Sequence, residues 1–186
     1  VKYVVVPWHD VSKLAGGEGW EETVRDFNEK AELFAKNGML LGYHNHDFEF
    51  EKFEGKYLHD YIMEALPDGM IFPELDTCWV NVGGEEPSAY VEKYSGRAPI
   101  VHLKDFSGSK GNGPLYKLIG IEEEETESKS TFEFRPVGYG CQDWKKIIAS
   151  AEKAGAGWVV VEQDDPSMGK TPMECAEMSI GYVKTL

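Results

Sequence analysis

Short apolar runs alternate with segments of helical periodicity along the chain. The runs are rich in β-branched residues and end at polar residues, which predicts short buried strands. Five such runs are present, at 1–6, 40–46, 71–76, 100–105 and 158–164. The alternation of strands with helices predicts a parallel sheet with right-handed crossovers, and a spacing of about 30 residues is typical of a βα-barrel repeat.

The first three predicted helices lie between the first four strands. Apolar residues recur at helical spacing over 20–34, and Gly38 follows as a C-terminal cap. A short helix over 57–66 stops before Pro67. Pro87 suits the first turn of the third helix, because its missing N–H is not needed there.

The last two predicted helices carry clearer end signals. Asp143 is a good N-cap, and Gly155 ends the helix that follows it. Thr171 and Glu174 form a capping box at the start of the last helix, with Pro172 in its first turn. The apolar stripe of this helix consists of Met173, Ala176, Ile180 and Val183.

One long segment, 107–142, interrupts the alternation and is predicted to be an insertion. It is rich in Gly at its start and then carries four consecutive glutamates, Glu122–Glu125. The flanking stretches 116–121 and 131–137 are predicted to pair as a hairpin across the barrel mouth. We expect the acidic run to be the solvated tip of that hairpin, because clustered like charges repel one another.

Four of the strands finish on a residue type that binds metal ions. These residues are His44, Asp76, His102 and Glu162. The carboxyl ends of parallel strands meet at one edge, where a βα-barrel builds its active site. Imidazole and carboxylate ligands together suit Mn²⁺, Co²⁺, Mg²⁺ or Zn²⁺. The pattern therefore predicts one divalent metal site.

Composition narrows the choice of partners. The formal net charge of -14 over 186 residues opposes binding to nucleic acid or to an anionic membrane surface. Three scattered cysteines are too few for a disulfide framework, which favours a reduced, cytoplasmic compartment. The chain opens directly on a strand pattern without Met, so we expect a portion of the natural protein to precede Val1.

Several motifs resemble one known group of proteins, the xylose-isomerase-like barrel superfamily. The motifs are 2–8, 42–50, Glu74-Leu75-Asp76-Thr77, Val101-His102-Leu103-Lys104-Asp105, 138–144 and Val161-Glu162-Gln163-Asp164. The group holds sugar isomerases and epimerases, inosose dehydratases and endonuclease IV-type repair enzymes. The resemblance implies a single domain over 1–186, an α/β fold of the (β/α)8 TIM-barrel type, incomplete, with five of eight strands visible.

By this resemblance the first strand of this chain corresponds to the fourth strand of the family's barrel. The first three βα units of the family would then have no counterpart in the chain. A barrel closes by pairing its first and last strands, and an incomplete one leaves two open edges. The resemblance therefore implies a homo-oligomer or a partner chain that covers the open edge.

The resemblance also implies a ligand set. Members hold one divalent ion, Mn²⁺ being our leading expectation, between a Glu, an Asp, a His and a second Glu. Asp76, His102 and Glu162 match the last three. Many relatives read Glu-Asn-His where this chain reads His44-Asn45-His46, so His44 takes the place of the first Glu. We expect His44 to be a ligand and His46 to act as base or hydroxyl contact, with the reverse assignment left open.

The remaining candidates lie beside these positions. Lys104 shares a strand face with His102 and is predicted to be catalytic by neutralising negative charge, the alternative being an ion pair with Glu74 or Asp105. Glu162 is predicted to be catalytic as well as a ligand. We expect Trp8, Trp79 and Gln163 to bind substrate, although core packing is nearly as good an explanation for the two tryptophans.

A divalent ion that bridges a carbonyl oxygen and a neighbouring hydroxyl acidifies the carbon between them, so that a base forms an enediolate. Proton return then gives isomerisation or epimerisation, and loss of a β-hydroxyl gives dehydration. The leading expectation is a sugar isomerase or epimerase acting on a ketose or polyol. The alternatives are a keto-inositol dehydratase or lyase and a non-catalytic barrel fragment; an endonuclease ranks below them.

Overall fold

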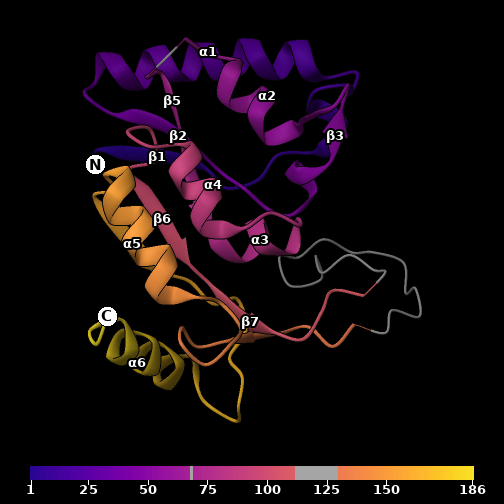
Figure 1. Cartoon of the computed structure of the whole chain (residues 1–186). Helices are drawn as coiled ribbons and strands as arrows, with labels where there is room; N and C mark the ends of the chain where they lie inside the picture. Colours follow the sequence, from indigo (N-terminus) through magenta and orange to yellow (C-terminus); the bar gives the residue numbers. More distant parts are fainter. Residues whose placement is uncertain (68, 112–129) are drawn as a thin grey trace.

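A five-stranded parallel sheet forms the centre of the protein. The computed structural model describes residues 1–67, 69–111 and 130–186 (Figure 1). The strands, in their order across the sheet, are β1 (Tyr3–Val6), β2 (Leu40–His44), β5 (Ile71–Asp76), β6 (Ile100–Leu103) and β9 (Trp158–Val161). All neighbouring strands are parallel. The fold is α/β with a half-barrel sheet, and the prediction of an incomplete TIM-type barrel is confirmed.

The strands pair with little stagger, so their carboxyl ends lie together. His44 at the end of β2 is level with Glu74 on β5. Asp76 at the end of β5 is level with His102 on β6. Leu103 is level with Val161, the last residue of β9. This register gathers the predicted ligands at one edge of the sheet.

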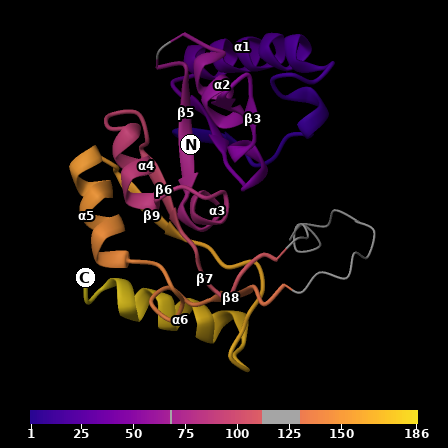
Figure 2. The ribbon, with the colours of Figure 1, turned by 45° about the vertical axis from the view of Figure 1, so that its right-hand side comes forward.

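Six α-helices lie within the described residues. They are α1 (Trp20–Lys36), α2 (Leu58–Glu64), α3 (Thr77–Val82), α4 (Pro87–Lys93), α5 (Trp144–Ala154) and α6 (Pro172–Val183). In Figure 2, α1, α4, α5 and α6 follow one another in an arc outside the strands. Five of the six are predicted from sequence. The exception, α3, is too short for an apolar period to be visible and follows directly on β5.

The predicted helix ends are confirmed. The side chain of Asp143 accepts a hydrogen bond from the backbone N–H of Lys146, and Gly155 ends α5 in the left-handed region with φ +80. Glycine suits this position because it has no Cβ to clash. Thr171 and Glu174 form the reciprocal capping box of α6.

The apolar stripe of α6 is largely exposed. Met173 is 71% exposed and Ile180 is 45% exposed, whereas the buried positions of α6 are Cys175 and Ser179. Edge strand β9 presents a similar surface, since Trp158 is 63% exposed. The expectation that a partner chain covers the open edge of the sheet stays a prediction.

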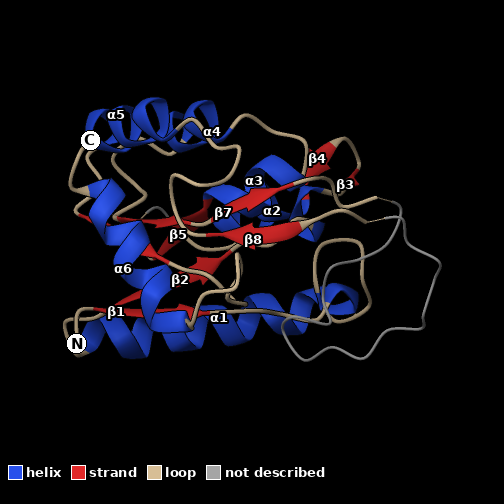
Figure 3. Cartoon of the chain, turned by 90° about the horizontal axis from the view of Figure 1, so that it is seen from below, coloured by secondary structure: helices blue, strands red, loops and turns tan. Residues whose placement is uncertain are grey.

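Two small hairpins flank the sheet. One pairs β3 (Lys52–Phe53) with β4 (Lys56–Tyr57), and the other pairs β7 (Asp105–Ser107) with β8 (Glu133–Arg135) (Figure 3). The predicted strand 131–137 thus exists in part, but its partner is β7, which continues the chain directly beyond β6. The other predicted strand, 116–121, and the acidic run lie outside the described residues. In the described part of the chain, no helix is both long and apolar enough to span a bilayer.

Candidate metal centre and substrate cavity

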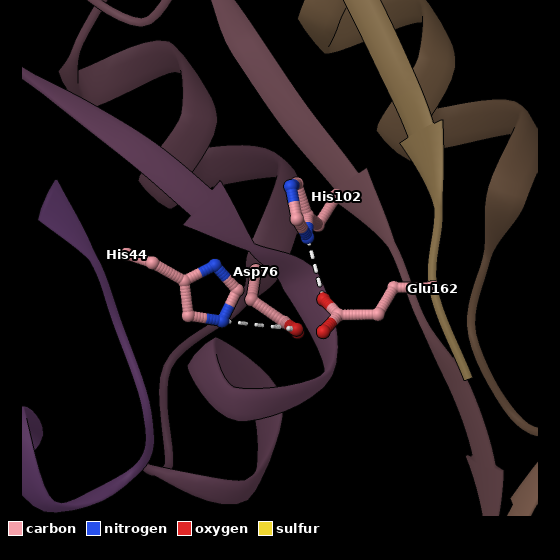
Figure 4. Close-up of side chains that lie close together, drawn as sticks. All are labelled: His44, Asp76, His102 and Glu162. Atoms are coloured by element: carbon pink, nitrogen blue, oxygen red, sulfur yellow. Dashed lines mark hydrogen bonds and ion pairs between the residues drawn. The ribbon is translucent and has the colours of Figure 1, made fainter. Parts of the chain in front are cut away.

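The four predicted ligands lie together at the carboxyl edge of the sheet. His44, Asp76 and His102 come from β2, β5 and β6, and Glu162 follows directly on β9. One nitrogen or oxygen atom from each lies within 4.8 Å of the others. Figure 4 shows the four side chains pointing toward a common centre. Residues separated by up to 118 positions therefore share one site, as the strand-end pattern predicts.

Asp76 is fully buried and has two separate tasks. Its Oδ1 accepts hydrogen bonds from the backbone N–H groups of Cys78 and Trp79, and so caps α3. Its Oδ2 faces the group, 3.7 Å from Nε2 of His44, and accepts no hydrogen bond from any described residue. A buried carboxylate oxygen without a donor is costly, and a cation at the common centre would satisfy it. The donor set therefore fits a divalent ion.

Asn45 holds the two strand ends in place. Its side-chain oxygen accepts from the backbone N–H of Asp76 at 3.0 Å, and its amide donates to the Asp76 carbonyl at 3.3 Å. This pair of bonds ties the segment after β2 to the end of β5. The middle residue of the His-Asn-His motif thus fixes the backbone that follows His44 relative to the backbone of Asp76.

Glu74 joins the site, although the sequence predicted it only as an alternative ion-pair partner of Lys104. Its two carboxylate oxygens lie 3.2 Å from Nδ1 of His44 and 3.2 Å from Nε2 of His102. Burial alone would raise the pKa of Glu74, but the bonds from His102 and His44 lower it to about 2. Its place two residues before Asp76 on the same strand face was the available signal.

His102 lies between two carboxylates. Its Nδ1 is 2.5 Å from Oε2 of Glu162, and its Nε2 contacts Glu74. Burial disfavours the imidazolium, but the hydrogen bonds to Glu162 and Glu74 outweigh it and raise the pKa of His102 to about 10. The environment is thus strongly anionic and suited to a positive charge.

Lys104 is 1% exposed and lies behind the group. Its ammonium is 2.8 Å from Asp164 and 3.6 Å from both Asp76 and Glu162. Burial opposes its charge, but these three carboxylates together hold the pKa of Lys104 above its ordinary value. The predicted alternative partners, Glu74 and Asp105, are not those observed.

Asp105 serves the backbone of the following segments instead. Its carboxylate accepts from the indole N–H of Trp144 and from several backbone N–H groups, those of Phe106, Gly138, Gly140 and Gln142. It is buried and therefore organises the turn that carries the chain from β8 into α5.

His46 lies past the end of β2, beside the group. Its ring is stacked on Phe48 and its centroid lies 5.2 Å from that of His44. Burial and the neighbouring charges of His44 and Lys104 lower the pKa of His46 to about 3. Its Nδ1 has no hydrogen-bond partner among the described residues.

A cavity of about 530 Å³ opens over this group. Its lining residues are Val5, Pro7, Trp8, His44, His46, Glu74, His102 and Glu162. Of the three predicted substrate contacts, Trp8 lines this cavity. Trp79 is buried beneath His46 and Lys104. Gln163 lines a separate cavity of about 210 Å³ and donates to the Asp165 carbonyl.

Glu49 supports the segment that carries His46. It is fully buried, and its carboxylate accepts from the Tyr43 hydroxyl at 2.6 Å and from the His46 backbone N–H at 2.7 Å. Burial raises the pKa of Glu49 to about 8, although both hydrogen bonds oppose the rise.

Glu49 should therefore make stability depend on pH. Its folded pKa is raised from 4.5 to about 8, so the folded state holds an extra proton between these values and loses stability as pH rises through them. We expect the difference in melting temperature between Glu49→Gln and wild type to shift in favour of the variant from pH 5 to pH 8. Thermal unfolding in EDTA tests this, and parallel pH profiles would contradict it.

Comparison with known proteins places this geometry in a family. An inosose dehydratase of Clostridium beijerinckii is 26% identical over 173 residues, covering 90% of this chain and 54% of the relative. A sugar phosphate isomerase/epimerase structure from Parabacteroides distasonis superposes with a TM-score of 0.70 at 22% identity, covering 98% of this chain and 57% of that one. The structure of IOLI protein with a bound zinc atom superposes with a TM-score of 0.62 at 18% identity, covering 99% and 62%.

This chain spans about half the length of the curated relatives it matches. The family model described as xylose isomerase-like TIM barrel matches residues 1–185, which is nearly the whole chain. The match agrees with the parallel half-barrel. The chain belongs to the xylose isomerase-like TIM barrel family.

Proposed function

We propose that this chain carries the metal-holding side of a divalent-metal-dependent lyase that dehydrates a keto-inositol or a related keto-polyol. The observation that carries the proposal is the convergence of His44, Asp76, His102 and Glu162 below an open cavity. The similarity to inosose dehydratases favours dehydration over isomerisation, which is the leading expectation from the sequence. The family supports an enzyme; the lyase reaction and its substrate are the proposal.

The ion would be held by His44, Asp76, His102 and Glu162. Two neutral imidazoles and two carboxylates balance the charge of a divalent ion. The bound ion would polarise a substrate carbonyl and so acidify the neighbouring C–H. The structure of IOLI protein, which is similar in fold, has a bound zinc atom, and this favours a divalent ion for this chain. Mn²⁺ stays a prediction.

Glu162 is the candidate proton acceptor. It lines the cavity, and its side chain is 32% exposed, the most exposed of the four ligands. Removal of the proton next to the carbonyl moves the C–H electron pair toward that carbonyl. Return of the pair expels the hydroxyl of the next carbon, which leaves as water with one proton. Glu162 can accept the first proton and return it to the departing hydroxyl.

His46 and Trp8 are candidate substrate contacts. His46 lines the cavity, and an imidazole there suits a hydrogen bond to a substrate hydroxyl. Trp8 presents a half-exposed ring to the same cavity, which suits the apolar face of a sugar or cyclitol ring. Lys104 does not line the cavity, so its charge would act through Asp76 and Glu162.

The substrate is proposed to carry no phosphate. Among the described residues that line the cavity there is no Lys or Arg, and phosphate groups are ordinarily held by such side chains or by helix N-termini. A neutral keto-polyol fits the lining better than a sugar phosphate does.

Product analysis tests the proposal. The protein is loaded with Mn²⁺, Co²⁺ or Zn²⁺ and incubated in D₂O with a panel of keto-inositols, free ketoses and ketose phosphates. We expect an unsaturated ketone from a keto-inositol, and Glu162→Gln should stop its formation. An isomer or epimer without water loss would contradict the lyase, and no deuterium exchange with any metal would support the non-catalytic fragment.

An isomerase or epimerase remains the second candidate. The fold similarity to the sugar phosphate isomerase/epimerase favours it. The same proton acceptor would serve, since isomerisation and dehydration share the first proton removal. The two candidates differ in where the electron pair returns, so the product assay separates them.

A further inference from the structure

We propose that Glu74 is a positioning residue, one carboxylate that sets which ring nitrogen of His44 and which ring nitrogen of His102 faces the metal. This role rests on the metal site of the proposed function. It assigns Nε2 as the ligand atom of His44 and Nδ1 as the ligand atom of His102.

The position of Glu74 in the sheet makes this possible. It is level with His44 across the β2–β5 pair and two residues before Asp76 on β5. Strand alternation gives Glu74 and Asp76 the same face, with Glu74 one layer further from the carboxyl edge. The carboxylate thus reaches both imidazoles from the side of the sheet interior.

Each oxygen of Glu74 takes a different ring. Oε2 lies 3.2 Å from Nδ1 of His44, and Oε1 lies 3.2 Å from Nε2 of His102. The two rings are themselves in edge contact, with centroids 4.8 Å apart. A single side chain therefore contacts both rings, and on His102 it acts opposite Glu162.

Hydrogen-bond chemistry then fixes the tautomers. An ionised carboxylate accepts only, so the nitrogen that faces it must carry a proton. The other nitrogen of a neutral ring then offers its lone pair. For His44 this is Nε2, which lies 3.7 Å from Oδ2 of Asp76 (Figure 4). For His102, Nδ1 lies 2.5 Å from Oε2 of Glu162, so without a metal both ring nitrogens face a carboxylate. A metal at the common centre would take the place of the proton on Nδ1, while Glu74 keeps the proton on Nε2.

Glu74 has no competing basic partner in the described part of the chain. Its ion pairs among the described residues are with the two imidazoles, whereas Lys104 pairs with Asp76, Glu162 and Asp164. The carboxylate is little exposed, so holding these rings is the contact that keeps it satisfied. Carboxylates that accept from metal-binding histidines raise metal affinity by orienting the ring.

Metal affinity tests the role. Glu74→Gln keeps the shape, but its amide nitrogen cannot accept from the second ring. We expect Zn²⁺ affinity, measured by chelator competition, to fall about 10–100-fold. Glu177→Gln, the same change at an exposed position of α6, is the matched control and should bind Zn²⁺ as wild type does. Melting temperature without metal shows whether each variant is folded.

Nitrogen NMR gives a second readout, first in the wild-type protein and then in the variant. In Zn²⁺-loaded wild type with ¹⁵N-labelled histidine, we expect His44 to be protonated at Nδ1 and His102 at Nε2. Glu74→Gln should release at least one ring from its tautomer. Both rings bound through the same type of nitrogen, or unchanged affinity and tautomers in a folded Glu74→Gln, would overturn the role.

The outcomes separate this role from the metal site itself. Wild type that binds Zn²⁺ while Glu74→Gln behaves identically overturns the role of Glu74 and leaves the site standing. Wild type that fails to bind Zn²⁺ overturns the site and, with it, the role.

Discussion

His102→Ala is expected to reduce the affinity for Zn²⁺ and Mn²⁺ by more than about 100-fold, because it removes a proposed ligand, and loss of an outer hydrogen-bond partner alone costs about 10–100-fold. The substitution also leaves Glu74 and Glu162 without the imidazole between them. Two carboxylates then face each other in a site that is largely buried. Calorimetric titration of metal into the folded variant measures the loss.

His9→Ala provides the matched control for this substitution. His9 packs against Phe27 and does not belong to the group of four. Its loss should leave metal affinity within about twofold of wild type. Full metal occupancy in His102→Ala would show that the four side chains do not act together, whatever their spacing.

Asp105→Ala is expected to destabilise the protein by about 3–5 kcal/mol. Two buried donors, the backbone N–H of Phe106 and the indole N–H of Trp144, lose their acceptor at once, and each unsatisfied buried group costs about 1–3 kcal/mol. Two partly buried donors, the N–H groups of Gly138 and Gly140, lose the same acceptor and lie in a turn where the carboxylate is packed tightly. A Cβ built on Gly140 would lie 2.1 Å from Oδ1 of Asp105.

Thermal and urea unfolding measure this effect. For a chain of this length, the loss corresponds to a fall in melting temperature of about 10 °C or more. Asp165→Ala, an exposed aspartate near the same end of the barrel, should stay within about 0.5 kcal/mol of wild type. A melting temperature of Asp105→Ala equal to that of the control would mean that the carboxylate network does not hold the turn.

The sequence predicted that the four candidate ligands lie together, because parallel strands align their carboxyl ends. A polar residue that closes each apolar run is then sufficient to place His44, Asp76, His102 and Glu162 at one edge, without knowledge of side-chain angles. The helix ends were predicted for a different reason, which is that their signals are local. The caps at Asp143 and Thr171 depend on hydrogen bonds between residues three apart in sequence.

Contacts between distant side chains could not be predicted in the same way. Lys104 could reach several carboxylates from its strand, and only the folded chain shows that Asp164 is the nearest. Glu74 faces two histidines because of the register between β2, β5 and β6, which the sequence does not specify to the residue. The partner of β8 was missed because the expected hairpin pairs neighbours within the insertion, whereas β7 extends from β6.

The exposed stripe of α6 has a different cause. Helical spacing identifies which residues share a face, but it does not say what covers that face. Met173 and Ile180 are exposed beside edge strand β9, whose Trp158 is exposed too. The apolar pattern therefore predicted the helix correctly, but it did not predict that the apolar face would be exposed.

The most direct test is metal stoichiometry in the wild-type protein after stripping with a chelator and reloading. We predict one divalent ion per chain and a rise in melting temperature with metal concentration, because an ion that binds the folded state alone stabilises it by mass action. The absence of stoichiometric Mn²⁺, Co²⁺ or Zn²⁺, together with an unchanged melting temperature, would contradict the site on which the proposed chemistry depends.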